Sequence, residues 1–325
     1  MEELVTYKQF IDKLRNGLGT VFGEEFSTDL MKVNKSDDYV LDAVVISKNY
    51  PDDADAPDSP HTVEALSVNL YTEELYAEYK AGAAFGDIMF RAVSSVENSF
   101  GLADWTKAVV KNLFSFEKIK AQLIIRGISY DGNKLLLTRH VYRRLADIAF
   151  VLYAMANDSE HSMASIKVGK ELAEGWGVDL EKVQDDALKN TSILFPPRLM
   201  AIEHFILHQK DAKKNTYNFM DPHSNFKMMR SLTETYVLTN DHQINGATAC
   251  FYPGVLEKLA RLFRSNFYIV PTSIHEVMLH PAGAFTIDEM RKKAKAQQPL
   301  VTPDSFLSHA VFLYNKDKGT LTAKL

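Results

Sequence analysis

The sequence reads TYVLTN at Thr235–Asn240, GATACFYPGVLEKLA at Gly246–Ala260 and YIVPTSIHEVMLHP at Tyr268–Pro281, and this stretch decides the fold. Its apolar runs, separated by turn residues, predict a strand, a turn, a second strand through Cys250, a capped helix and a pair of strands. Pro253 suits the first turn of that helix, where a missing N–H costs nothing. The stretch therefore predicts a compact unit that combines strands and helices.

Similar patterns extend over the rest of the chain. Thr6 and Gln9 form a capping box ahead of a first helix, which we expect to end at the glycines Gly17 and Gly19. We expect an α+β fold with mixed, mainly antiparallel sheets and flanking helices, built from two or three β-β-α-type units. The expected blocks are 1–115, 116–215 and 216–325, packed as one or two compact domains.

Three further segments carry specific expectations. The Pro- and Asp-rich run at 50–61 predicts an exposed loop, because nothing in it can pack. The segment at 194–210, LFPPRLMAIEHFILHQK, predicts a proline break followed by an amphipathic helix. The polar region at 211–231 is poorly patterned, so we expect a hinge or a long loop there.

Composition restricts the compartment and the partners. The chain has 325 residues, a net charge of -5 and a single cysteine, Cys250, so no intrachain disulfide can form. The N-terminus lacks the basic and apolar regions of a signal peptide, and the longest apolar run, at 148–155, is too short for a membrane span. We expect a cytoplasmic, soluble protein without global attraction to nucleic acid or anionic lipid.

Catalytic-type side chains gather at close spacing in PTSIHEV. If this segment is extended, Ser273 and His275 project from one face and Glu276 from the other. A histidine beside a hydroxyl can act as a general base toward a nucleophile, although a triad needs a third group from elsewhere. The alternative is structural: a strand-end histidine bonded to the backbone, with Glu276 paired to a nearby base.

Histidine pairs offer little support for a metal site. His275 and His280 are five residues apart, so on a strand their rings face opposite ways and do not form the H-E-x-x-H zinc motif. His204 and His208 are better spaced, four apart on a predicted helix, but no other ligand is indicated nearby. We expect a solvated helix edge there, and a metal site only as the weaker alternative.

Basic residues form two clusters that could meet phosphates. One contains Arg139, Arg143 and Arg144, and the other spans 291–295. Neither is interleaved with aromatic residues in the manner of a stacking platform, so solvated helix faces are the competing interpretation. The chain also lacks a Walker loop, a G-x-G-x-x-G and a C-x-x-C, and no cofactor is expected.

The chain resembles a bacterial family of proteins, the domain-of-unknown-function family 5688, over nearly its whole length. The resemblance rests on the opening stretch, on the tail LSHAVFLYNKDKG and on WGVDLEKVQDDALKNT at Trp176–Thr191. Thr272 stands where the family motif reads P-S-S-I-H-E, and His309 replaces the acid of the family's L-S-D. Members are common in gut Gram-positive bacteria and often encoded on mobile elements. The family brings no established activity.

Three functions are left open by the sequence. The leading hypothesis is a non-enzymatic binding protein of a mobile element that acts on a host protein. The second is an enzyme, a hydrolase or transferase, centred on His275 with Ser273 or Glu276. The third is nucleic-acid binding through either basic cluster. No membrane partner is expected, and the oligomeric state is left open.

Overall fold

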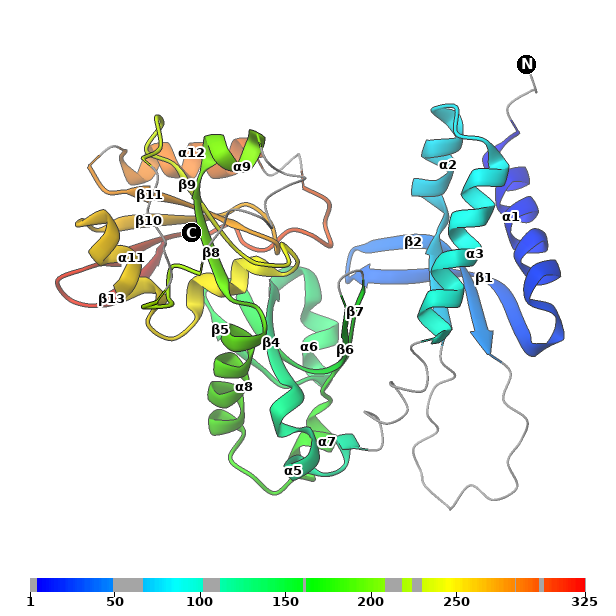
Figure 1. The fold of residues 1–325 in the computed structure, drawn as a ribbon, viewed down its shortest axis with the longest axis horizontal. Coiled ribbons are helices and arrows are strands. Elements are labelled where there is room, and N and C mark those ends of the chain that lie inside the picture. Colours follow the sequence, from blue (N-terminus) through cyan, green and yellow to red (C-terminus); the bar gives the residue numbers. More distant parts are fainter. Residues whose placement is uncertain are drawn as a thin grey trace. The chain divides into compact units, whose positions relative to one another are not determined.

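The computed structural model describes residues 5–48, 67–101, 112–159, 162–207, 218–223, 230–283, 285–297 and 301–324. The chain divides into two compact units, Met1–Ala108 and Val109–Leu325 (Figure 1). The loop expected at 50–61 and most of the hinge expected at 211–231 lie outside the described residues. None of the described helices has both the length and the apolar composition needed to cross a membrane.

The first unit packs helices against a three-stranded antiparallel sheet of order β1-β2-β3. Its core joins Phe10 and Leu14 of the first helix to Ile46 of the central strand and Ile88 of the last helix, all fully buried. The elements are α1 (Tyr7–Phe22), β1 (Phe26–Ser36), β2 (Tyr39–Lys48), β3 (Ser67–Tyr71), α2 (Thr72–Lys80) and α3 (Phe85–Gly101).

The predicted capping box of α1 is confirmed, whereas its predicted end is wrong. The Thr6 side chain accepts the N–H of Gln9, and the Gln9 side chain accepts the N–H of Thr6. The helix continues through Gly17 and Gly19 because a glycine costs only about 1 kcal/mol inside a helix. It ends where Gly23 adopts a φ of 64°.

The second unit begins with a four-stranded sheet in which β6 is central. β4 pairs with one edge of β6, and β5 and β7 pair with its other edge. The strands are β4 (Leu123–Ser129), β5 (Tyr142–Leu145), β6 (Ile148–Ser159) and β7 (Ser162–Lys167). The helices around it are α5 (Phe116–Ile119), α6 (Lys134–Arg139), α7 (Lys170–Glu174) and α8 (Leu180–Leu194), the last capped by Asp179.

A six-stranded antiparallel sheet of order β13-β12-β10-β11-β9-β8 completes the second unit. Its strands are β8 (Pro197–Ala201), β9 (Tyr236–Asn240), β10 (Phe267–Pro271), β11 (Val277–Pro281), β12 (Val311–Asn315) and β13 (Thr320–Lys324). The helices are α9 (Ile202–Leu207), η4 (Gly246–Phe251), a 3-10 helix, α11 (Val255–Phe263) and α12 (Ile287–Gln297). β8 comes from the expected middle block, yet it pairs with β9 of the last block.

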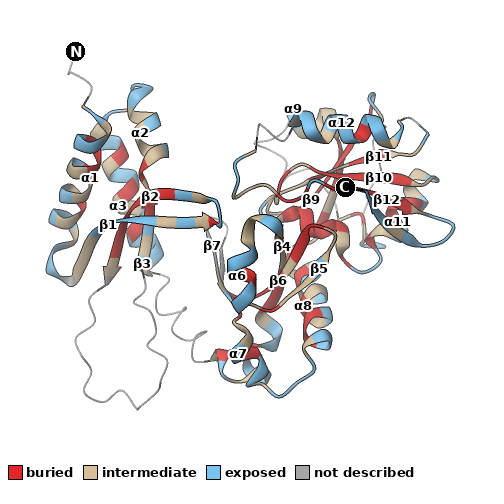
Figure 2. Cartoon of the chain, turned by 180° about the vertical axis from the view of Figure 1, so that it is seen from behind, coloured by how far each residue is buried: buried red, intermediate tan, exposed pale blue. Residues whose placement is uncertain are grey.

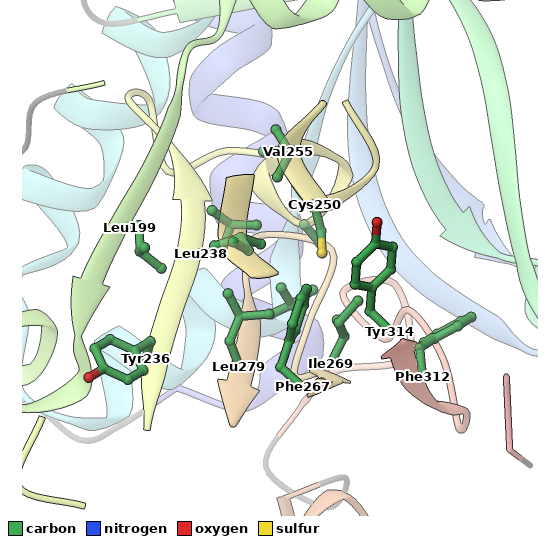
Figure 3. Packing of buried hydrophobic residues seen from close by; sticks show 14 of the residues in the cluster. Leu199, Tyr236, Leu238, Cys250, Val255, Phe267, Ile269, Leu279, Phe312 and Tyr314 are labelled. Carbon is green, nitrogen blue, oxygen red and sulfur yellow. The ribbon is translucent and has the colours of Figure 1, made fainter. Parts of the chain in front are cut away.

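Alternate residues along the strands of the six-stranded sheet lie on opposite faces and pack into two different cores. Phe267 and Ile269 of β10 pack with Leu279 of β11 against η4 and α11, in the cluster that also contains Cys250 (Figure 3). Val270, the residue directly after Ile269, packs on the opposite face against α12. Buried positions follow the strands and the inner sides of the helices (Figure 2). This arrangement confirms an α+β fold with mainly antiparallel sheets.

Two elements differ from the predictions. The segment through Cys250 is the helix η4 rather than a strand, because a short buried apolar run does not distinguish the two. Residues 197–201 form the strand β8 and the helix α9 begins at Ile202, so the predicted amphipathic helix starts later than expected. Pairing with β9 provides β8 with its backbone partners and overrides local helix propensity.

Candidate functional site

The family motif lies at a turn between two neighbouring strands. β10 ends at Pro271 and β11 begins at Val277, directly opposite, so residues 272–276 form a five-residue hairpin loop. The extended backbone expected for Ser273–Glu276 is therefore wrong. The alternation rule that would place Ser273 and His275 on one face does not apply to a loop.

Hydroxyl groups in this loop converge on Glu276. The hydroxyls of Thr272 and Ser273 each lie 2.9 Å from Oε1 of Glu276. The Ser273 oxygen also accepts the backbone N–H of His275 at 2.9 Å, and the Thr272 hydroxyl lies 2.9 Å from the carbonyl oxygen of Glu276. These contacts form a self-contained network, typical of serine and threonine side chains that satisfy turn backbone.

His275 is tied to the loop that follows β9. Its Nδ1 accepts the backbone N–H of Asn245 at 3.2 Å, and its carbonyl oxygen accepts the hydroxyl of Thr239 at 2.7 Å. Because Nδ1 accepts a hydrogen bond, a neutral His275 ring carries its proton on Nε2. The structure brings Ser273 to Glu276 and not to the imidazole, so the hydroxyl–histidine pair required for base catalysis is not formed.

Gly246 permits this close approach. A Cβ on Gly246 would lie 2.1 Å from the Thr239 hydroxyl oxygen, 2.5 Å from the His275 carbonyl oxygen and 2.6 Å from the Asn240 nitrogen. Asn245, the preceding residue, adopts a φ of 52° in the left-handed region. Asn245 and Gly246 therefore allow the loop after β9 to pack closely against the hairpin loop at residues 272–276.

Nearby titratable groups belong to the core. Burial raises the pKa of the Cys250 thiol and of the Tyr252 hydroxyl far above their ordinary values, so both stay protonated. Cys250 is fully buried, as expected for an inert core thiol. Its neighbours are apolar side chains of the six-stranded sheet (Figure 3).

His280 occupies an interior position in β11. Its Nδ1 lies 3.3 Å from the Thr235 hydroxyl, and its ring meets Phe285 edge to face. Burial, followed by the nearby charge of Lys293, lowers the pKa of His280 to about 4. The described residues contain no group of three or more histidine, cysteine or acidic side chains arranged to hold a metal ion.

His204 lies in α9, half-buried, while its predicted companion His208 lies outside the described residues. The neighbouring Glu203 binds the turn before β9, a role that the sequence did not predict. Its Oε1 accepts the N–H groups of Leu232 and Thr233 at 2.9 and 3.1 Å and the Ser231 hydroxyl at 3.0 Å. Hydrogen bonds, first from its own backbone N–H and then from Ser231 and Thr233, lower the pKa of Glu203.

The arginines of the predicted basic cluster contact different neighbouring residues. Arg143 donates to the carboxylate of Asp185 at 2.5 Å and to the carbonyl of Glu181, so its charge is neutralised. The guanidinium carbon of Arg144 instead lies over the ring of Tyr130. Arg139, at the end of α6, is exposed. The three arginines therefore do not form one continuous basic surface.

A buried carboxylate was missed by sequence reasoning. Asp147 accepts the Ser308 hydroxyl at 2.5 Å and the backbone N–H of His309 at 2.7 Å. It lies in the two-residue turn between β5 and β6, 161 positions before Ser308. No local sequence pattern predicts a contact between residues so far apart in the chain.

Residues 7–316 match the family described as "Family of unknown function (DUF5688)". The match covers nearly the whole chain, including the hairpin loop and the segment that carries Ser308. No curated protein and no solved structure matches the chain.

Proposed function

Since the chain belongs to the DUF5688 family, whose function is unknown, we propose from its own surface that it is a non-enzymatic protein that binds a partner protein. The hairpin loop supports a non-enzymatic function, because its hydroxyl groups and its carboxylate are already hydrogen-bonded within the loop. An apolar patch on the second unit carries the proposal.

The patch consists of Ile206 and Leu207 of α9 and Leu232 of the turn before β9. Their exposed fractions are 62%, 78% and 91%, respectively. Glu203 binds the N–H of Leu232, and Ile206 and Leu207 follow Glu203 by three and four residues, on the same side of the helix. The three exposed apolar residues therefore come from two segments that the Glu203 carboxylate connects.

Glu203 also connects the two parts of the patch. Its Oε1 is hydrogen-bonded to Ser231, Leu232 and Thr233, which ties the turn to α9. Contiguous exposed apolar surface marks protein interaction sites, and a surface ordered in advance loses little entropy on binding. We infer that the partner offers an apolar pocket, and that it is a cytoplasmic protein of the bacterium that hosts the mobile element.

The test is affinity purification of the tagged chain from a host bacterium, with the captured proteins quantified. We expect one protein to be enriched by the wild type and to be reduced about tenfold by Leu232→Glu, because a buried charge opposes docking. Leu135→Glu is the matched control, since Leu135 is 67% exposed in the same unit but lies on α6. Equal capture by the wild type and Leu232→Glu would refute the proposal, as would the absence of any enriched protein.

A further inference from the structure

Basic side chains from two elements lie near the ring of Tyr130. Arg144 of β5 lies over this ring, 3.7 Å from its centroid, and the amine of Lys134 in α6 lies 6.0 Å from it. The hydrogen bond from Lys134, and then the charges of Arg144 and His309, lower the pKa of Asp131 next to it. Lys134, Arg144 and His309 therefore act on one small region, here called the Tyr130 patch.

Arg144 is held in place before any ligand arrives. Its Nε donates to the carbonyl of Ala146 at 2.7 Å, and its guanidinium carbon lies over the ring of Tyr130. Within the described part of the chain, its two terminal amino groups have no hydrogen-bond partner. They form a planar fork directed to solvent, the geometry that suits two oxygens of one phosphate.

The buried Asp147 links this arginine to His309. Asp147 follows Ala146 in the β5–β6 turn, and its carboxylate accepts the backbone N–H of His309 at 2.7 Å. The His309 ring packs on Phe306, with 4.5 Å between the centroids. The turn that follows the strand of Arg144 therefore also holds the segment that carries His309, although the two are far apart in sequence.

We propose that the Tyr130 patch binds the phosphate group of a small phosphorylated molecule. Arg144 supplies the fork, and Lys134 supplies a further donor. Asp131 opposes binding, because its carboxylate forms an ion pair with Lys134 at 2.9 Å. A single phosphate is favoured over a nucleic-acid strand, because the neighbouring Arg143 is already neutralised by Asp185.

Isothermal titration of the full chain with inorganic phosphate, at constant ionic strength, tests the site. We expect saturable binding that Arg144→Gln weakens about tenfold, the loss of one charged hydrogen-bonding group. Arg143→Gln is the matched control, adjacent in sequence, and should change the affinity less than about twofold because that charge is already paired. Each variant is first checked by thermal melting.

A second variant acts in the opposite direction. Asp131→Asn removes the opposing carboxylate and frees Lys134, so we expect phosphate to bind about threefold more tightly. A cluster that only holds the turn together would show no such gain. The absence of saturable phosphate binding, or equal losses in Arg143→Gln and Arg144→Gln, would overturn the proposal. Tighter binding of a single-stranded oligonucleotide than of phosphate would also overturn it and assign the patch to nucleic acid.

Discussion

At the scale of single residues, Gly246 has no room for a side chain. The Gly246→Ala change would place a methyl group within 2.6 Å of the Asn240 nitrogen and 2.5 Å of the His275 carbonyl oxygen. Backbone atoms cannot give way as a flexible side chain can, so we expect a loss of about 3 kcal/mol in urea unfolding. Gly169→Ala is the control, because its nearest neighbour would be 3.7 Å away. Equal losses in both variants would contradict this account.

His280 should make the second unit sensitive to acid. Its pKa falls from 6.5 in the unfolded chain to about 4 in the fold, so the unfolded state binds a proton that the folded state does not. Stability is then complete above pH 6.5 and decreases by about 3 kcal/mol as the pH falls toward 4. Urea unfolding at several pH values measures this slope. His280→Gln should flatten it, while the exposed His309→Gln should retain it.

The sequence located the polar loop but not its geometry. Ser273, His275 and Glu276 are close in the chain, so their proximity could be predicted. Their partners could not, because Asn245 and Thr239 contact His275 from 30 and 36 positions away. The pair of strands around the loop was predicted, but the end of the first strand was not, because residues 272–276 contain neither glycine nor proline to mark it.

At the scale of elements, the outer edge of β4 is capped by side chains. The N–H of Ile125 donates to the Thr191 hydroxyl at 2.8 Å, and that of Gly127 to the Thr248 hydroxyl at 2.9 Å. Thr191→Val leaves the Ile125 N–H buried without a partner, so we expect a loss of about 2 kcal/mol and faster hydrogen exchange at that amide. Thr138→Val, at an exposed position of α6, should change neither quantity.

The elements that could be predicted carry their signals locally. The capping box at Thr6 was predicted because the signals of a helix start lie in neighbouring residues. By contrast, η4 and β8 depend on distant partners. Thr248 of η4 satisfies Gly127, and Arg198 of β8 pairs with Thr239 of β9. The local propensity of these two segments is compatible with either a helix or a strand, and contacts with distant residues determine which one forms.

At the scale of the whole molecule, β8 joins the two expected later blocks into one unit. It lies at 197–201, before the expected boundary at 215, yet it forms the edge of the sheet built by 236–324. The hydrogen bond from Ser308 to Asp147 adds a second, buried connection. The first unit has its own apolar core, which includes Phe10, Leu14 and Ile88.

This division predicts how fragments of the chain behave. The fragments 1–108 and 109–325 should each unfold cooperatively, because every buried cluster draws its residues from one of them alone. A fragment 216–325 should not, because it lacks β8 and exposes the face of η4 that caps β4. Thermal melting followed by circular dichroism, with amide NMR dispersion, distinguishes the cases. If 216–325 melted cooperatively and 109–325 melted in two steps, the later half of the chain would contain two domains rather than one.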